Sequence, residues 1–429
     1  MGQVYHPNAS AVAEGFRCYG SPGRAWLRAN DLPPPGRAVT VPVGGRYLGI
    51  LGAAALCYAA LGAVLRALPW FVGARLHGGP VAIGLAVGAP SITGALLRPV
   101  GGRLADRSGP MPVMLGGAGL MAVGVLPAFL PNLVALVVSR LLVGCGEALM
   151  MSSAVTWLLV LAGPVRRGRA LGHIGLANYA GLTVGPVLAD AIALRAHTDI
   201  LWATAILLPL LGGLLAATQG GVRKERGDGF VPKSEARGPE GSPLRQTLRP
   251  GLGLLLVNVG YVAVLSFGAT AAAAHHIHMG AIVVPIFGVG VIASRTLLAD
   301  IPDRMGAGRT LVGGALAAGA GLAILAVTSN EPMAVLGVLV IALGQGMSVP
   351  ALGLLALSRI HPSRYGAAAG LFFAYFDAGV GLGGPLVGLV ARVVGAPFAL
   401  LAAGVAVAVA APVALLFMGS SGSSVGSSS

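Results

Sequence analysis

The sequence predicts an all-α integral membrane protein with twelve transmembrane helices arranged as two six-helix halves. Three observations predict this fold. The composition is too apolar for a soluble protein, the chain contains a series of apolar runs long enough to cross a bilayer, and several motifs recur at a fixed distance in the second half of the chain. Long apolar runs and an internal repeat are together typical of polytopic helical membrane proteins.

The composition excludes the soluble class. Hydrophobic residues make up 55% of the 429 residues, charged residues make up 10%, and the mean hydropathy is +0.84. Soluble domains average roughly 45–50% apolar and about 25% charged residues, so this chain has too little polar surface for water. The 68 glycines fit closely packed membrane helices. Cys18, Cys57 and Cys145 are scattered, so we expect neither a disulfide framework nor a metal site.

The apolar runs are predicted to be helices because lipid cannot satisfy exposed backbone groups, and about 20 helical residues cross the hydrocarbon core. Six runs precede the longest polar stretch and six follow it. Their centres are expected near residues 58, 88, 120, 145, 180, 208, 261, 289, 318, 344, 378 and 406.

The remaining segments divide the chain. Residues 1–45 have no apolar periodicity and no signal-peptide order, and we expect a disordered cytoplasmic arm. The halves are expected at 46–218 and 250–418, joined by a cytoplasmic linker at 219–249 that is rich in charged residues, Gly and Pro. The Gly/Ser-rich stretch 419–429 is expected to be a disordered tail.

The basic residues are distributed unevenly between the two sides of the predicted membrane. One set of alternate loops contains Arg103, Arg107, Arg166, Arg167, Arg169, Arg223, Lys224, Arg226, Lys233, Arg237, Arg245, Arg249, Arg304, Arg309, Arg359 and Arg364. The other set contains only Arg66, Arg75, Arg195 and Arg392. This positive-inside pattern predicts that both termini are cytoplasmic and that the net charge of +14 reflects membrane topology, so no nucleic-acid partner is expected. We expect the protein in the plasma membrane, which in a bacterium is the inner membrane.

An internal repeat relates the halves. Arg98, Asp106, Arg107 and Gly109 recur as Arg295, Asp303, Arg304 and Gly306, each 197 residues later (295 − 98). Pro164, Arg166, Gly168, Ala170, Gly172, Gly181 and Gly185 recur 198 residues later (362 − 164), from Pro362 to Gly383. Gly146-Glu147 likewise corresponds to Gly344-Gln345. Parallel repeats of this kind place a binding cavity at the interface of the halves, near the middle of the membrane.

Three motifs resemble those of the major facilitator superfamily. Gly102-x-x-x-Asp106-Arg107-x-Gly109 is similar to the signature between its second and third helices. Arg140-x-x-x-Gly144-x-Gly146 resembles its fourth-helix motif, and Gly181-x-x-x-Gly185-Pro186 resembles the fifth-helix motif of its antiporter branch. The resemblance covers roughly residues 46–418 and implies transport by alternating access, in the drug and sugar efflux branch. Two departures are that Pro110 and Pro112 replace the basic residues that usually follow the signature, and that Ala189-Asp190 replaces a pair of small residues.

The resemblance implies a conformational latch at the repeated signature. Asp106 with Arg107, and Asp303 with Arg304, are expected to bridge helix ends across the gap between the halves, with Gly102, Gly109 and Gly306 shaping the loops. An exposed ion pair is worth about 0–1 kcal/mol, which is enough to bias two nearly balanced states. The alternative is a solvated loop that only follows the positive-inside rule.

Arg140 and Glu147 are ionisable residues inside one apolar run. They are seven residues apart, so two helical turns place them on nearly the same face, toward the bundle interior. We expect them to take part in proton coupling, because the resembled antiporters use the arginine of this motif in that way and a buried glutamate can bind a proton. The alternative is structural: Arg140 near the outer interface and Glu147 bonded to a neighbouring helix. In both cases Gly144, Gly146, Gly181, Gly185 and Pro186 are expected to pack helices.

Asp377 is the other acid deep in an apolar run, among aromatic residues, and the repeat aligns it with Tyr179. It is a candidate to hold a proton or a cationic substrate. A structural hydrogen bond to Asn258 or Tyr261 is an equal alternative. The expected cavity residues are polar or aromatic groups where apolar ones would cost less, namely Asn178, Tyr179, Asn258, Tyr261, Gln345 and Tyr375.

The predicted function is secondary active transport of a small molecule, as proton-coupled efflux by a monomer in the lipid bilayer. No Walker motif indicates ATP hydrolysis, and we expect no cofactor, no metal and no enzymatic activity. Uptake or facilitated diffusion is the transport alternative, in which Glu147 is structural. A receptor or scaffold without flux is the alternative from another class.

Overall fold

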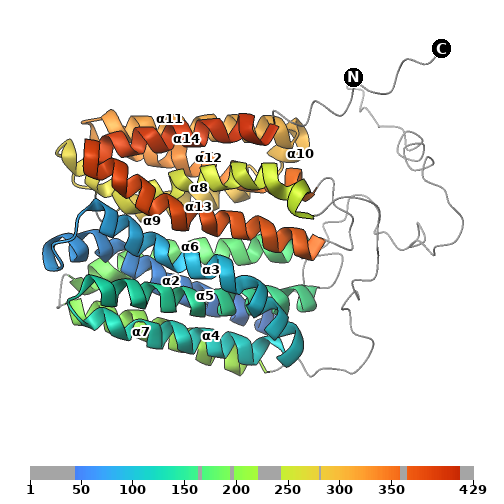
Figure 1. Ribbon diagram of the computed structural model, residues 1–429. Helices are drawn as coiled ribbons and strands as arrows, with labels where there is room; N and C mark the ends of the chain where they lie inside the picture. Colours follow the sequence, from blue (N-terminus) through green and yellow to red (C-terminus); the bar gives the residue numbers. More distant parts are fainter. Residues whose placement is uncertain are drawn as a thin grey trace, which may run out of the picture. The chain divides into compact units, whose positions relative to one another are not determined.

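A computed structural model of the chain describes residues 44–162, 167–193, 198–220, 243–279, 282–357 and 365–415. Every regular element within these ranges is a helix, which confirms the predicted all-α fold (Figure 1). The predicted arm and tail lie outside the described residues, except Gly44 and Gly45 at the start of the first helix, and so does most of the predicted linker.

The first half, called the N half below, contains six long helices. They are α2 (Gly45–Trp70, continued by the π turn η2, Phe71–Arg75), α3 (Pro80–Ser108), α4 (Pro110–Gly124, continued by the 3-10 turn η3, Leu126–Phe129), α5 (Leu133–Ala162), α6 (Arg167–Ala193) and α7 (Thr198–Thr218). Both α3 and α4 begin with proline, which suits the first turn because no intrahelical partner is lost there. Gly109 between them has φ = 89°, a backbone conformation that glycine adopts without a steric penalty.

The second half, called the C half, repeats this pattern. Its helices are α8 (Pro243–Ala274), α9 (Val283–Leu297), the short α10 (Ile301–Met305), α11 (Ala307–Val327), α12 (Glu331–Leu357), α13 (Tyr365–Val394) and α14 (Ala396–Leu415). Gly306 has φ = 84°, so both signature glycines take the same left-handed conformation before a helix starts. Helix α8 begins at Pro243, inside the predicted linker, because proline is well tolerated as the first residue of a helix.

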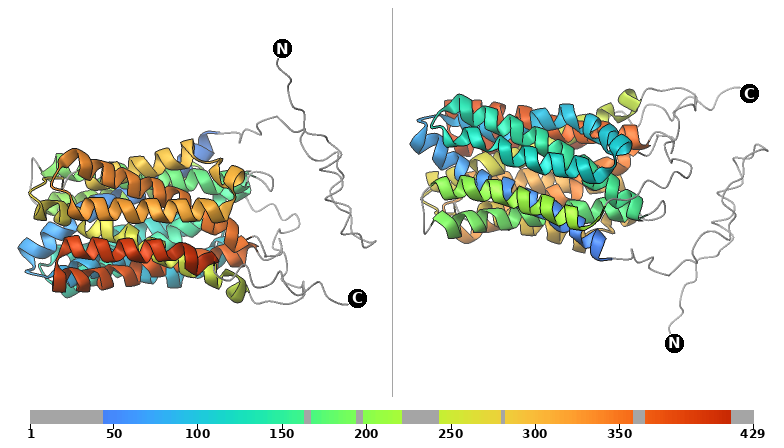
Figure 2. Two further views of the ribbon diagram at one scale, coloured as in Figure 1. Left: turned by 90° about the horizontal axis from the view of Figure 1, so that it is seen from above. Right: turned by 90° about the horizontal axis from the view of Figure 1, so that it is seen from below.

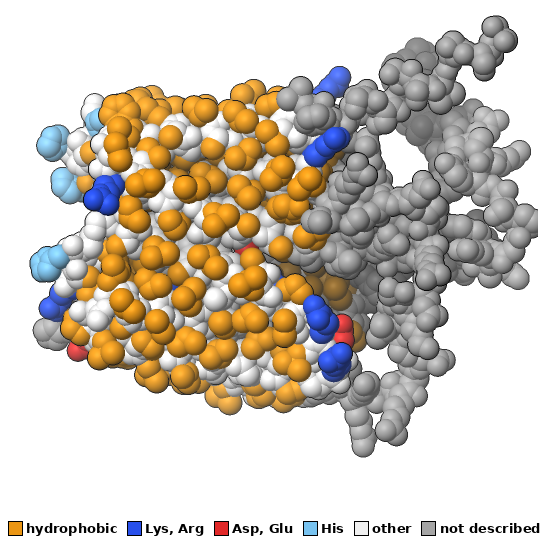
Figure 3. Space-filling view, viewed as in Figure 1, with side chains coloured by type: hydrophobic (Ala, Val, Ile, Leu, Met, Phe, Trp, Pro, Cys, Tyr) orange, Lys and Arg blue, Asp and Glu red, His pale blue; other side chains and the backbone are white. Residues whose placement is uncertain are grey.

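The twelve predicted centres each fall within a different helix, and the twelve-helix prediction is confirmed. Among the described residues, ten helices are long and apolar enough to cross a membrane, and α9 is a shorter apolar helix. The twelfth, α6, has 27 residues. Figure 3 shows the corresponding surface, in which Lys and Arg side chains lie at the two ends of the helical body and the flank between them is largely apolar.

The two halves lie side by side with their helices nearly parallel, as the views in Figures 1 and 2 agree. Two helix pairs form most of the interface between them, α3 with α13 and α6 with α9. Within the N half, α2 packs against α6, and α5 packs against both α3 and α4. The predicted packing glycines lie in these contacts.

Those glycines allow very close approach of helix backbones. A Cβ atom at Gly144 would lie 2.2 Å from the carbonyl oxygen of Pro90 on α3, and one at Gly146 would lie 2.5 Å from a backbone nitrogen of α4. Gly181 and Gly185 face α2, where added Cβ atoms would lie 2.2 Å from carbonyl oxygens. Pro186 lies inside α6, next to Gly62 of α2. Such distances leave no room for a side chain.

The closest contacts between the halves lie toward one end of the bundle. We call the end where α3 ends at Ser108 the signature end, and the end where α3 begins at Pro80 the opposite end. A Cβ atom at Gly84 would lie 2.0 Å from the carbonyl oxygen of Gly384, and one at Gly388 would lie 2.6 Å from that of Pro80. The halves are therefore in backbone contact near the opposite end.

Candidate functional site

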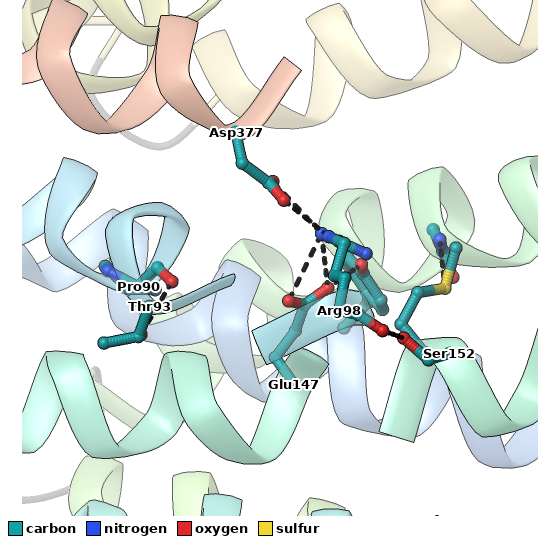
Figure 4. Close-up of polar contacts among 9 residues, drawn as sticks. Pro90, Thr93, Arg98, Glu147, Ser152 and Asp377 are labelled. Atoms are coloured by element: carbon teal, nitrogen blue, oxygen red, sulfur yellow. Dashed lines mark hydrogen bonds and ion pairs between the residues drawn. The ribbon is translucent and has the colours of Figure 1, made fainter. Parts of the chain in front are cut away.

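Arg98 lies between the two halves and contacts an acid from each of them. Its side chain is 18% exposed and extends from α3. Nη2 donates to Oε1 of Glu147 on α5 at 3.2 Å, within the N half. Nε donates to Oδ2 of Asp377 on α13 at 2.5 Å, and Nη2 donates to Oδ1 of the same residue at 3.1 Å, across the interface. Figure 4 shows the arginine between the two carboxylates.

The polypeptide around Arg98 holds this geometry. The hydroxyl of Tyr58 on α2 donates to Glu147 Oε1, and Ser152 Oγ on α5 donates to the carbonyl oxygen of Arg98 at 3.1 Å. One turn earlier on α3, a Cβ atom at Gly94 would lie 3.4 Å from Asp377 Oδ2 and 3.7 Å from Glu147 Oε2. Glycine at this position therefore lets both carboxylates approach α3.

The cluster of Arg98, Glu147 and Asp377 contains one positive charge and up to two negative charges in a largely buried place. The side chains of Glu147 and Asp377 are 9% and 3% exposed. An unpaired charge inside a membrane protein is costly, so the guanidinium compensates the acids and holds the halves together through Asp377. Because each proton bound by an acid removes one negative charge, the net charge of the cluster depends on how many protons the two acids hold.

Arg140 does not join this cluster, although the sequence pairs it with Glu147. It is 3% exposed, and its Nε donates to the carbonyl oxygen of Ala86 on α3 at 3.0 Å. Both side chains face the bundle interior as expected, but the seven residues between them separate the groups along α5 by roughly 10 Å. Glu147 has Arg98 and Tyr58 as its partners instead.

Asp377 makes neither of the structural hydrogen bonds that the sequence suggested as an alternative to a functional role. Asn258 donates from Nδ2 to the carbonyl oxygen of Leu254 at 2.8 Å and accepts at Oδ1 from Gln345 Nε2 at 3.3 Å. The ring of Tyr261 packs against Phe287 and Phe376, with centroid distances of 5.6 and 6.0 Å. These contacts all lie within the C half.

Tyr179 lies at the other helix pair of the interface. The guanidinium carbon of Arg295 on α9 lies 4.9 Å from the centroid of its ring, in a cation–π contact. The neighbouring Asn178 is 8% exposed, its Nδ2 lies 3.4 Å from Met151 Sδ, and its Oδ1 has no hydrogen-bond partner among the described residues. Tyr375 lies elsewhere, with its ring against Gly251 of α8.

The predicted latch residues lie at the signature end. Asp106 and Arg107 are exposed and have no ion pair within the described part of the chain. Arg304 Nη2 lies 3.4 Å from Asp300 Oδ2, one turn earlier in the chain, where both side chains are more than three-quarters exposed. The side chain of Asp303 lies outside the described residues. No bridge between the halves at this end is therefore described, and the latch stays a prediction.

Sequence reasoning did not assign site roles to Arg98, Arg295 or Tyr58. The first two were noticed only as members of the repeat, each eleven residues before a signature glycine. Arg98 and Arg295 met the same criterion that singled out Glu147, since each is an ionisable residue inside an apolar run. Tyr58 gave no signal, since a tyrosine in a membrane helix is ordinary.

Comparisons with known proteins agree with this fold. Residues 50–384 match the sequence profile of the Major Facilitator Superfamily. An uncharacterised MFS-type transporter of Salmonella typhimurium is 30% identical over 350 residues, which cover 79% of this chain and 88% of that protein. A second uncharacterised MFS-type transporter, from Burkholderia pseudomallei, is 30% identical over 396 residues, which cover 90% and 94%.

Solved structures share the fold at low sequence identity. A bacterial homologue of the human lysosomal transporter Spinster, in an inward-facing and occupied conformation, superposes with a TM-score of 0.70 at 16% identity, covering 86% of this chain and 95% of that one. The nucleoside transporter NupG gives 0.68 at 13% identity, covering 87% and 99%. Since the family profile spans most of the sequence and the relatives match over nearly their whole lengths, the chain belongs to the major facilitator superfamily of membrane transporters.

Proposed function

We propose that this protein is a proton-coupled secondary transporter that exports a small molecule by alternating access. The main support for the proposal is that Arg98 binds Glu147 in its own half and Asp377 in the other half. An ion pair across the moving interface, with a second acid beside it, links the charge state of the site to the separation of the halves.

The proposed cycle depends on which acid holds a proton. With Asp377 ionised, its pair with Arg98 joins α3 to α13 and favours the packed arrangement. A proton on Asp377 removes that attraction, and Arg98 stays neutralised by Glu147 alone, so the halves can separate without leaving a bare charge. A change of about 1.4 kcal/mol in this bias would alter the ratio of the two conformations tenfold.

Export and membrane orientation are part of the proposal. The antiporter-type motif at Gly181, Gly185 and Pro186 packs α6 tightly on α2 and supports the export direction. Arg103, Arg107 and Arg309 are exposed near the signature end, which supports a cytoplasmic location for it.

The test is proton movement across proteoliposomes that contain the reconstituted protein and a pH-sensitive dye. A panel of small molecules is screened for compounds that release protons into or out of the vesicles, and Glu147→Gln and Asp377→Asn are compared with the wild type. Glu331→Gln is the matched control, because that acid is exposed at the start of α12. We expect both site variants to lose substrate-driven proton flux, and we expect the control to keep it.

A second readout separates coupling from transport. Exchange of labelled for unlabelled substrate at equal pH needs conformational cycling but no net proton movement. We expect Glu147→Gln to retain this exchange while proton flux disappears. Proton-coupled flux that persists in both site variants would contradict the proposed role of the acids, and substrate flux without proton movement in the wild type would favour facilitated diffusion.

A further inference from the structure

Arg295 is a cation at the interface of the halves for which the described residues supply no acid. Its guanidinium lies over the ring of Tyr179 on α6, and a Cβ atom at Gly175, one turn before that tyrosine, would lie 2.9 Å from Nη1. Nε is covered and has no hydrogen-bond acceptor among the described residues. The residue as a whole is partly exposed.

The repeat shows what is missing around Arg295. It corresponds to Arg98, which binds two carboxylates. The position of Glu147 is taken in the C half by Gln345, which bonds to Asn258. The position of Asp377 is taken in the N half by Tyr179. Both acids of the first site are thus replaced by neutral groups at the second.

A guanidinium inside the membrane is costly unless an anion or water accompanies it. Its planar donor edges match a carboxylate in two parallel hydrogen bonds, and the tyrosine ring below it adds a flat apolar surface. We propose that Arg295 and Tyr179 form the binding subsite for the anionic group of the substrate, and that the transported molecule is a small organic anion of the carboxylate class with an apolar or aromatic part. The assignment of this ligand as the substrate rests on the transport function proposed above.

The ligand completes a second ion pair at the interface while the first pair responds to protons. The two sites lie on different helix pairs, α3 with α13 and α6 with α9, so that both can act on the same movement of the halves. The two arginines therefore have separate roles. Acids of the protein neutralise Arg98, whereas Arg295 binds the ligand.

The proposal is tested by ligand-induced stabilisation of the full chain purified in detergent. The probe is benzoate, and benzamide serves as its neutral counterpart of nearly equal shape. A ligand that binds only the folded protein raises its thermal unfolding midpoint, and the rise grows with the ratio of ligand concentration to dissociation constant. We expect benzoate to stabilise the wild type and benzamide not to do so. Arg295→Gln is expected to weaken benzoate binding about tenfold or more, since it removes a charge-assisted bidentate contact.

Two further variants control for folding and for general charge. Arg309→Gln removes an exposed arginine of α11 and should leave the affinity for benzoate unchanged. Arg295→Lys keeps the charge but not the planar donor edge, so we expect an affinity between those of the wild type and Arg295→Gln. A native elution profile of each variant on size exclusion shows that any loss of binding is not a loss of fold.

The outcomes are distinct from those of the proton test. Equal binding of benzoate by the wild type and Arg295→Gln would overturn the subsite, as would stabilisation by benzamide equal to that by benzoate, or no stabilisation by benzoate at all. Glu331→Gln is expected to bind benzoate like the wild type, because that acid is exposed at the start of α12 and belongs to neither site. If proton coupling fails while this pattern holds, the anion subsite stands and the coupling proposal falls.

Discussion

Arg98 and Arg295 occupy equivalent places in the two halves and have opposite surroundings. The first is held by Glu147 and Asp377, and the second lies over the ring of Tyr179 without an acid among the described residues. Both arginines stand eleven residues before a signature glycine. The difference shows that the repeat has kept the cation in each half, while the acids around it are present on one side only.

This asymmetry explains how a duplicated fold can contain two unlike sites. The repeat places the two arginines at equivalent positions of the chain, each on the second helix of its half. The substitution of two neutral residues is enough to turn a compensated charge into an uncompensated one. In the proposed mechanism, function therefore depends on the few positions where the repeat is broken.

The largest effect is expected when each arginine is removed in turn. Arg98→Gln leaves two largely buried carboxylates without a cation, which should cost about 3–5 kcal/mol of stability. Arg295→Gln removes a charge that has no protein acid and should cost less than about 1 kcal/mol. Thermal unfolding of both variants in the same detergent measures the difference. Equal losses would mean that the two arginines are compensated alike.

A second change adds an acid to the neutral half. Gln345→Glu places a carboxylate where the only side-chain contact described is Asn258. We expect it to lower stability at neutral pH by roughly 1–3 kcal/mol, because Gln345 bonds to Asn258 and no contact between it and Arg295 is described, so a buried charge there would lack a partner. The loss should shrink as the pH falls, since the protonated carboxyl resembles the amide. Glu147→Gln is the reciprocal variant, and a stabilised Gln345→Glu protein would show that Arg295 reaches this position as Arg98 reaches Glu147.

A third change rebuilds the first site at the second. Tyr179→Asp introduces an acid beside Arg295, and the new ion pair should compete with an external anion. We expect affinity for benzoate to fall about tenfold, equivalent to about 1.4 kcal/mol, measured by the same thermal stabilisation. Tyr179→Phe keeps the ring and should bind benzoate nearly as the wild type does. Retained affinity in the aspartate variant would argue against the pairing.

The smallest effect is expected at the signature ends. Asp300→Asn breaks an ion pair with Arg304 that is exposed on both sides and should change stability by no more than about 1 kcal/mol. Asp106→Asn, in the other half, should be equally mild in unfolding experiments. If the latch operates, substrate flux falls in the Asp106 variant despite normal stability. Undiminished flux would show that Asp106 is a solvated residue at a helix end and has no latch role.

The fold and the internal repeat could be predicted from the sequence alone. Hydropathy runs located all twelve helices, because a bilayer imposes one element type and a minimum length. Glu147 and Asp377 could be singled out as buried acids, since an ionisable residue in an apolar run needs a reason. Their common partner could not be found, because Arg98 joins residues that are 49 and 279 positions away in the chain.

The rest of the site could not be predicted, because the sequence does not determine the direction of each side chain. Arg140 and Glu147 share a helix face by spacing, yet a long arginine side chain bonded to the backbone of α3 instead. Spacing alone does not fix where the end of a flexible side chain lies. Asn258 was another candidate partner for Asp377, and it satisfied its amide within the C half.

The glycine contact between α3 and α13 bears on how readily the halves can part. Gly84 and Gly384 meet through their backbones, and a Cβ on either would collide with the carbonyl group of the other. Glycine has no side-chain rotamers, so re-forming this contact between the halves orders no side chains there. Repeated opening and closing at this end would then cost little side-chain entropy at this contact, which suits the alternating-access cycle proposed above.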